Sequence, residues 1–191
     1  DVPFQWHPGF SPIQKQKSIN SLHASAKKIG LNTTLEVSTK SEVLVGRSLS
    51  AFNLNFELDS FQSTVESIYQ GSKKFENGGP YQDIYKNKSL EAKKDLRLKS
   101  SGDIVGFVFK KEEWPLSPLK GFYSWVYMKA LAQRKNLIFE KIRNFDSFTD
   151  IEFNPKKSIN CQAFCVACFI VLMKKNNLDE VLNDKKNFLK T

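Results

Sequence analysis

The sequence predicts an α+β fold in which helices dominate and a few short strands complete the structure. The chain has 191 residues, of which 40% are hydrophobic, and this is enough for one domain with a proper core. Several segments show helical periodicity, whereas only a few show the alternation or the β-branched runs typical of strands. Because no repeat, low-complexity tract or linker interrupts the chain, we expect a single domain over residues 1–191.

The first third of the chain is expected to pass from an irregular segment into a helix and then a strand. Residues 1–11 combine prolines with aromatic side chains and should pack irregularly onto the body. A helix is predicted from Pro12 to Lys28, with the proline in its first turn and Gly30 ending it. A short strand is expected over residues 35–38.

A strand, a helix and a turn are expected in the next segment. Residues 49–58 alternate apolar and polar side chains, which predicts a half-buried strand, with Asp59 and Ser60 capping the helix that follows. Residues 64–81 read as one amphipathic helix running into a sharp turn at residues 77–80, Asn-Gly-Gly-Pro. Its apolar stripe would consist of Phe61, Val65, Ile68 and Tyr69.

The second half should contain further helices and two strands. A helix over residues 161–173, apolar on nearly every side, is expected to be central. The other expected elements are a charged helical stretch at 82–99, a buried strand at 104–109, a rigid loop at 114–118, a helix at about 120–136, a short segment at 138–142, a strand at 148–153 and a charged terminal helix or tail at 174–191.

The charge balance favours a polyanionic partner. Lys and Arg number 29 against 20 Asp and Glu, a formal charge of +9, and the lysines occur in dispersed doublets that suit a folded basic surface. No apolar run is long enough to span a bilayer and no signal peptide is evident, so we expect no membrane partner. Three cysteines within eight residues do not form a disulfide framework, which indicates a cytoplasmic location.

Several kinds of chemistry are disfavoured. Cys161, Cys165 and Cys168 have the spacing of an iron–sulfur motif, but their apolar helical setting favours buried structural cysteines. With only two histidines and no glycine-rich phosphate loop, we expect neither a catalytic metal nor a bound cofactor.

One group of polar residues remains as a candidate site. On the predicted helix, Glu66, Gln70 and Lys73 fall at i, i+4 and i+7 and therefore on one side. A carboxylate can transfer a proton or activate water, and a lysine can bind phosphate or form a Schiff base. Such a pair suits cleavage of a glycosidic bond in a phosphorylated sugar, although a solvated helix face is the alternative.

Further motifs resemble the NADAR (YbiA-like) family. The segment VESIYQGSK at residues 65–73 is similar to the family's EHxYQAxKF element. Ser38 followed by residues 49–53, MKAL at 128–131, and Asp150 followed by KKSIN at 156–160 are similar to its other elements in the same order. The closer resemblance, carried by PGFSPIQKQKSI, FENGGPY, EEWPL and FTDIEFNPKKSINCQA, is to the NADAR antitoxins paired with DarT-type toxins, and it implies the NADAR fold.

The resemblance implies a function and a set of site residues. The activity would be hydrolysis of the N-glycosidic bond between ADP-ribose and guanine in DNA, reversing the modification made by a DarT-type ADP-ribosyltransferase. Glu66, Lys73 and Asp150 would be catalytic. The ligand-binding residues would be Ser38, Ser50, Gln70, Asn77, Gly78, Gly79, Tyr81, Trp114, Lys156, Ser158 and Asn160, with the 77–81 turn admitting the modified base and Trp114 able to stack on a base. Lys15 and Lys17 are weaker candidates for facing DNA.

Two other functions stay open at this point. The protein could be an N-glycosidase acting on a free phosphorylated ribosyl metabolite. Alternatively, it could be a non-catalytic antitoxin that binds nucleic acid or the toxin itself.

Overall fold

A computed structural model describes residues 2–9, 11–118, 120–153 and 161–190, and within them the helix-dominated α+β class is confirmed. The helical elements are α1 (Pro12–Lys28), α2 (Leu44–Ser48), α3 (Val65–Gly71), η1 (Gln82–Lys86), α4 (Ser89–Lys94), α5 (Arg97–Ser100), α6 (Gly121–Ala132), α7 (Lys135–Ile142), α8 (Gln162–Lys174), α9 (Leu178–Asn183) and α10 (Lys185–Phe188). The strands are β1 (Thr34–Glu36), β2 (Asn55–Glu57), β3 (Gln62–Thr64), β4 (Lys73–Phe75), β5 (Ile104–Phe109), β6 (Glu112–Trp114) and β7 (Ser147–Thr149).

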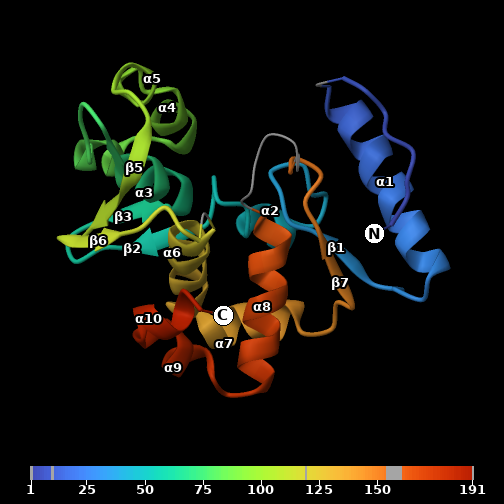
Figure 1. The fold of residues 1–191 in the computed structure, drawn as a ribbon. Coiled ribbons are helices and arrows are strands. Elements are labelled where there is room, and N and C mark those ends of the chain that lie inside the picture. The colour runs from blue at the N-terminus through green and yellow to red at the C-terminus, as the bar shows by residue number, and fades with distance from the viewer. Residues whose placement is uncertain (1, 10, 119, 154–160, 191) are drawn as a thin grey trace.

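The strands form three small sheets in different parts of the molecule. β1 and β7 pair in parallel, with Thr34 opposite Ser147 and Glu36 opposite Thr149. β2 and β3 form an antiparallel hairpin, and β4, β5 and β6 form an antiparallel sheet in that order. Helix α1 stands at one side of the molecule near β1 and β7, whereas the three-stranded sheet with α4 and α5 lies on the other side (Figure 1).

Helix α6 is the centre of the core. Phe122, Val126, Tyr127 and Leu131 on this helix are at most 1% exposed and pack among residues from both sides of the molecule. Helix α8, predicted to be central, packs one face against α6, β7 and α9. Its buried residues belong to the core, as a central helix requires, but its other face leaves Phe164 53% exposed and Val171 49% exposed.

The predicted strand at 49–58 is confirmed only at its end, where β2 forms. Before β2 the chain turns, because the carbonyl of Ser50 accepts hydrogen bonds from the N–H groups of Asn53 (2.8 Å) and Leu54 (2.7 Å). The expected cap at residues 59–60 was also wrong. Thr64 caps α3 instead, its Oγ1 accepting from the N–H of Ser67 at 3.2 Å, and residues 62–64 form β3, which the sequence did not predict.

Several boundaries differ from the prediction while the element types hold. The charged stretch at 82–99 is divided into η1, α4 and part of α5, and the helix expected to reach residue 136 ends at Ala132. Two short elements, α2 and β6, were not predicted, and β6 includes Trp114, which was expected to begin a loop. The strand expected at 148–153 is β7, which ends at Thr149 because the next residues form a turn.

Both terminal segments pack onto the fold. The irregular N-terminal segment is held on α1, where the N–H groups of Gln5 and His7 donate to the hydroxyls of Ser21 and Ser18, each at 2.9 Å. The C-terminal segment forms α9 and α10, and α9 buries Leu178 and Leu182 in the core.

Candidate active site

The acid–amide–amine group predicted on one helix is present, but the helix does not carry all of it. Helix α3 ends at Gly71, and Lys73 already belongs to β4. The chain is crowded where it leaves the helix, because a Cβ on Gly71 would lie 2.7 Å from the Tyr85 ring. The expectation that helical spacing aligns these three residues was therefore wrong for Lys73.

The three side chains nevertheless form a continuous hydrogen-bonded chain. Lys73 Nζ donates to Gln70 Oε1 at 2.6 Å, and Gln70 Nε2 donates to Glu66 Oε1 at 2.9 Å. The amine on one side and the carboxylate on the other fix the orientation of the Gln70 amide. Glu66 and Gln70 are each 6% exposed, so this chain is a buried polar group and not a solvated helix face.

Lys73 lies where an ammonium charge is disfavoured. Its Nζ lies 4.9 Å from the centroid of the Tyr69 ring, a cation–π contact that by itself favours the charged amine, but burial opposes the charge. Burial lowers the pKa of Lys73 below its usual value, the nearby charge of Glu66 opposes that change, and Lys93 lowers the pKa further. The amine is therefore neutral more often than that of an exposed lysine. Lys93, an exposed residue of α4, was not predicted to be near this site.

Asp150 follows β7 and is held by three N–H donors. Its Oδ2 accepts from the N–H of Gln162 at 3.3 Å and from Gln162 Nε2 at 3.0 Å, and its Oδ1 accepts from the N–H of Glu152 at 3.1 Å. Burial raises the pKa of Asp150 to about 6, and the charge of Glu36 adds to the rise although the Gln162 hydrogen bonds oppose it. This carboxyl group can therefore exchange protons near neutral pH.

A chain of hydrogen bonds connects Asp150 to the backbone of Glu66 in the first turn of α3. Gln162, which donates to Asp150, accepts through Oε1 from the N–H of Ala51. The carbonyl of Ala51 in turn accepts from the N–H of Glu66 at 3.0 Å. Burial raises the pKa of Tyr123 on α6, and Cys165, Tyr127, Glu66 and Asp150 each add to the rise. The predicted catalytic residues thus belong to one region.

Glu36 is a buried acid of this region that was not predicted as a site residue. It is 2% exposed and accepts from Thr149 Oγ1 at 2.6 Å and from the N–H of Ile151 at 2.8 Å, the two neighbours of Asp150 in the chain. Burial raises the pKa of Glu36. The sequence signal that could have identified Glu36 is a charged residue between the apolar residues Leu35 and Val37 of a predicted strand.

His23 extends this arrangement to α1. Its Nε2 lies 2.9 Å from Thr149 Oγ1, whose hydrogen is donated to Glu36, so the imidazole Nε2 carries the proton in this arrangement. Burial lowers the pKa of His23, which favours the neutral ring. Helix α1 is therefore coupled to the strand that positions Asp150.

Ser38 and Ser50, the predicted ligand-binding serines among the described residues, lie below the surface. Ser38 is fully buried; its hydroxyl donates to the carboxylate of Glu36 and accepts from the N–H of Lys40 at 3.2 Å. Ser50 is 1% exposed and lies at the turn before β2. Trp114 was expected either to stack on a base or to be a buried structural residue; it is 2% exposed and packs with Phe122 in the core, as the second alternative requires.

The predicted turn at residues 77–81 lies beside the backbone of Lys73. Gly79 has a φ of +72°, and a Cβ there would lie 2.3 Å from the carbonyl oxygen of Lys73. The N–H of Asn77 donates to the carbonyl of Ser101 at 3.0 Å. Gly78 closes the turn, since its carbonyl accepts from the N–H of Phe75 at 2.8 Å.

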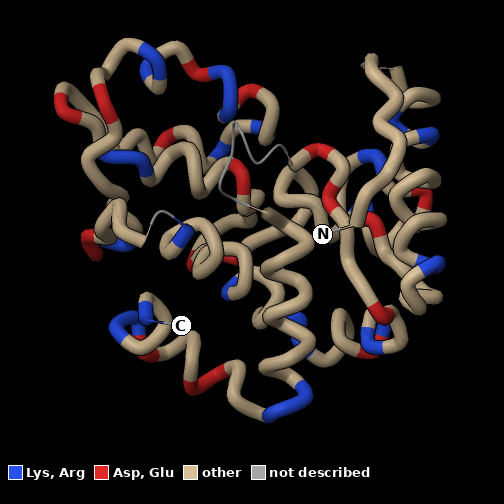
Figure 2. The backbone as a smooth tube through the Cα atoms, turned by 45° about the vertical axis from the view of Figure 1, so that its right-hand side comes forward, with Lys and Arg blue, Asp and Glu red and all other residues tan. Residues whose placement is uncertain are grey.

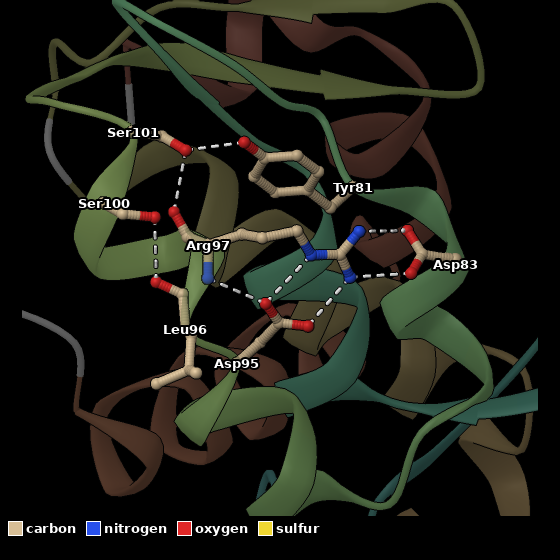
Figure 3. Close-up of polar contacts among 7 residues, drawn as sticks. All are labelled: Tyr81, Asp83, Asp95, Leu96, Arg97, Ser100 and Ser101. Carbon is tan, nitrogen blue, oxygen red and sulfur yellow. Dashed lines mark hydrogen bonds and ion pairs between the residues drawn. The ribbon is translucent and has the colours of Figure 1, made fainter.

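An arginine holds the far end of this turn in place (Figure 3). The Tyr81 hydroxyl pairs with Ser101 Oγ at 2.5 Å, and the Arg97 guanidinium lies over the Tyr81 ring, 4.5 Å from its centroid. Arg97 is itself held by the carboxylates of Asp83 (2.6 Å) and Asp95 (2.8 Å). A turn fixed at both ends has the rigidity that a specificity element needs.

The remaining predicted residues, Lys156, Ser158 and Asn160, lie outside the residues that the structure describes. Across residues 2–9, 11–118, 120–153 and 161–190, no group of three or more His, Cys, Asp and Glu side chains could hold a metal ion. The three cysteines are free thiols, and burial raises the pKa of Cys165 to about 12.

The fold and this region together define a helix-rich α+β protein with a buried acid–amide–amine site. Residues 1–191 match the family described as DarT1-associated NADAR antitoxin, so the chain belongs to that family and its role is that of an antitoxin in DarT systems. The predicted family relationship is confirmed. A comparison with curated proteins finds no match. Among the described residues, no helix is both long enough and apolar enough to cross a membrane.

Proposed function

We propose that this antitoxin is an enzyme that hydrolyses the N-glycosidic bond between ADP-ribose and guanine in DNA. The observation that carries the proposal is the buried chain Glu66–Gln70–Lys73, in which Gln70 links a lysine with a lowered pKa to a carboxylate. A solvated helix face would leave these three groups exposed and independent. Family membership supports the substrate, because the toxin that an antitoxin opposes in a DarT system is an ADP-ribosyltransferase.

In the proposed reaction Lys73 attacks the anomeric carbon of the ribose. Its neutral amine forms a bond to this carbon as the bond to the guanine nitrogen breaks, and the base leaves with a proton. Opening of the sugar ring converts the adduct into a Schiff base. Water then adds to the same carbon, which releases ADP-ribose and returns the amine.

Glu66 and Asp150 have different roles in the proposed reaction. Glu66 stabilises the positive charge that develops at the anomeric carbon and at the lysine nitrogen. Asp150, with a pKa of about 6, donates its proton to the departing base and recovers one from the attacking water. Overall, the hydroxyl of water goes to the sugar and its proton goes to guanine.

The diphosphate, the guanine base and the DNA strand are assigned to the remaining parts of the site by their positions. Lys93 supplies a further cation near Lys73 for the diphosphate of ADP-ribose. The turn at residues 77–81, fixed beside the Lys73 backbone, is the proposed boundary for the guanine base. The net charge of +9 favours binding of a DNA strand.

A direct assay tests the proposal. Purified protein is incubated with a DNA oligonucleotide carrying ADP-ribosylated guanine, and free ADP-ribose is measured by mass spectrometry. Release by the unmodified protein and its loss in Glu66→Gln and Lys73→Ala, with folding retained, is the expected result. Lys74→Ala is the matched control, because Lys74 neighbours Lys73 in β4 but pairs with Glu113 on the surface at 2.8 Å.

A second experiment tests the lysine step. Borohydride added during turnover should reduce the Schiff base and leave a stable adduct on Lys73, which peptide mass spectrometry can locate. Activity without any adduct would restrict Lys73 to an electrostatic role. Absence of ADP-ribose release from a folded protein would contradict the proposal and favour a toxin-binding antitoxin.

A further inference from the structure

A groove of about 590 Å³ runs between α1 and the segment from residue 39 to α2. The catalytic roles proposed above do not use it. Cations line both of its walls, with Lys17 on the α1 side and Lys40 and Arg47 on the opposite side, while Glu42 is its one acidic lining residue among those described. Lysines and arginines otherwise occur along the whole chain, interspersed with acids (Figure 2), so the two-sided arrangement is the notable feature.

The wall opposite α1 is built to bind a polar ligand. The Nη1 atom of Arg47 donates to the carbonyls of Ser41 (2.7 Å) and Glu42 (3.1 Å), which holds the guanidinium at the groove. Ser41 is 2% exposed, and its hydroxyl has no hydrogen-bond partner among the described residues. That hydroxyl is buried against α2, since a Cβ on Gly46 would lie 2.4 Å from Ser41 Oγ, so Arg47 is the group that this wall offers to a ligand.

The groove adjoins the candidate active site through short links. Thr39 and Lys40 line the groove directly after Ser38, which bonds to Glu36. Glu152, whose N–H donates to Asp150, accepts from Thr39 Oγ1 at 2.8 Å. Lys40 Nζ also lies 3.9 Å from Glu152. A strand lying in the groove would therefore come close to Asp150.

We infer that this groove binds the sugar–phosphate backbone of the DNA strand that carries the modified guanine. Cations on two facing walls suit a polyanion that passes between them. The inference rests on the proposed function for the identity of the strand. The diphosphate of ADP-ribose has the same chemistry but is assigned to the Lys73 side, where Lys93 is available.

Binding can be tested without turnover. Fluorescence anisotropy with an unmodified single-stranded oligonucleotide of about 12 nucleotides measures affinity across a series of salt concentrations. Replacing Lys17, Lys40 and Arg47 together by Gln should reduce the slope of log affinity against log salt by about 2, or about 0.7 for each lost phosphate contact. Lys17→Gln is a single variant that leaves the Arg47 contacts intact, and it should weaken binding.

Matched controls separate the groove from general charge. Lys28→Gln removes an exposed lysine in the last turn of the same helix and should leave affinity close to that of the unmodified protein. Glu42→Gln should strengthen binding. Equal weakening in Lys28→Gln and Lys17→Gln would overturn the inference.

A second arm measures ADP-ribose binding by calorimetry. Loss of ADP-ribose affinity in Lys17→Gln with unchanged DNA affinity would assign the groove to the diphosphate and would also overturn the inference. If the hydrolase proposal is wrong, the unmodified protein releases no ADP-ribose, but DNA binding that depends on the groove residues is still measured.

Discussion

Replacing Asp150 by Asn should stabilise the protein above neutral pH and lose that advantage in acid. In the folded protein the pKa of Asp150 is about 6, compared with 3.8 for an unperturbed group. Above pH 6 the group is charged in both the folded and the unfolded chain, and the folded state bears the cost of the buried charge. As pH falls from 6 towards 3.8 the folded state takes up its proton first and gains stability relative to the unfolded chain.

The size of the effect follows from the difference in pKa. About two pKa units correspond to about 3 kcal/mol, of which about 2.5 kcal/mol falls between about pH 4 and about pH 7.5. Asn keeps only one acceptor oxygen, so it loses the hydrogen bond from Glu152 or those from Gln162, at a cost of about 1 kcal/mol at every pH. Asp150→Asn should therefore be near neutral or slightly destabilising at about pH 4 and stabilising by about 2 kcal/mol at about pH 7.5.

Urea unfolding followed by tryptophan fluorescence at a series of pH values measures the difference between the variant and the unmodified protein. Because other titrating groups are common to both, most of their contribution cancels. Asp146→Asn is the matched control from the start of β7: hydrogen bonds from Thr33 and Asn32 lower the pKa of Asp146. Relative to the unmodified protein, that variant should lose stability as pH rises through the pKa of Asp146, and the difference should then stay constant. A difference for Asp150→Asn that does not change between pH 4 and pH 7.5 would refute the reasoning.

Three further predictions concern the surroundings of the site. Gly79→Ala should destabilise the protein by about 1–3 kcal/mol in urea unfolding, because φ is +72° and the added Cβ would lie 2.3 Å from the Lys73 carbonyl; an unchanged midpoint would contradict this. Glu36→Gln should move the alkaline limb of the pH–activity profile to lower pH, because Asp150 must carry the proton that it donates and removing the charge of Glu36 lowers the pKa of Asp150; a profile that keeps its position would assign Glu36 a packing role only. Tyr81→Phe removes the hydroxyl that is bonded to Ser101 and should cost about 1 kcal/mol of stability while ADP-ribose affinity is retained. Loss of that affinity, measured by calorimetry, would contradict the view that the Tyr81 hydroxyl only holds the turn in place.

The sequence by itself determined the elements whose signals are local. Helix α1 begins at Pro12 and ends before Gly30, and β5 spans residues 104–109, both as predicted. Periodicity, helix-end residues and β-branched runs act over a few residues, so they can be read without the rest of the fold. The family relationship was likewise accessible because its motifs are short segments in a recognisable order.

Only the tertiary structure decided how the site is assembled. Lys73 lies on β4, beyond the end of α3 and paired with β5, yet its Nζ still donates to Gln70 Oε1. Glu36 and Asp150 come together because β1 and β7 pair in parallel across more than a hundred residues. No local pattern specifies such a pairing, since its stability comes from burial and from hydrogen bonds that exist only once the distant segments meet.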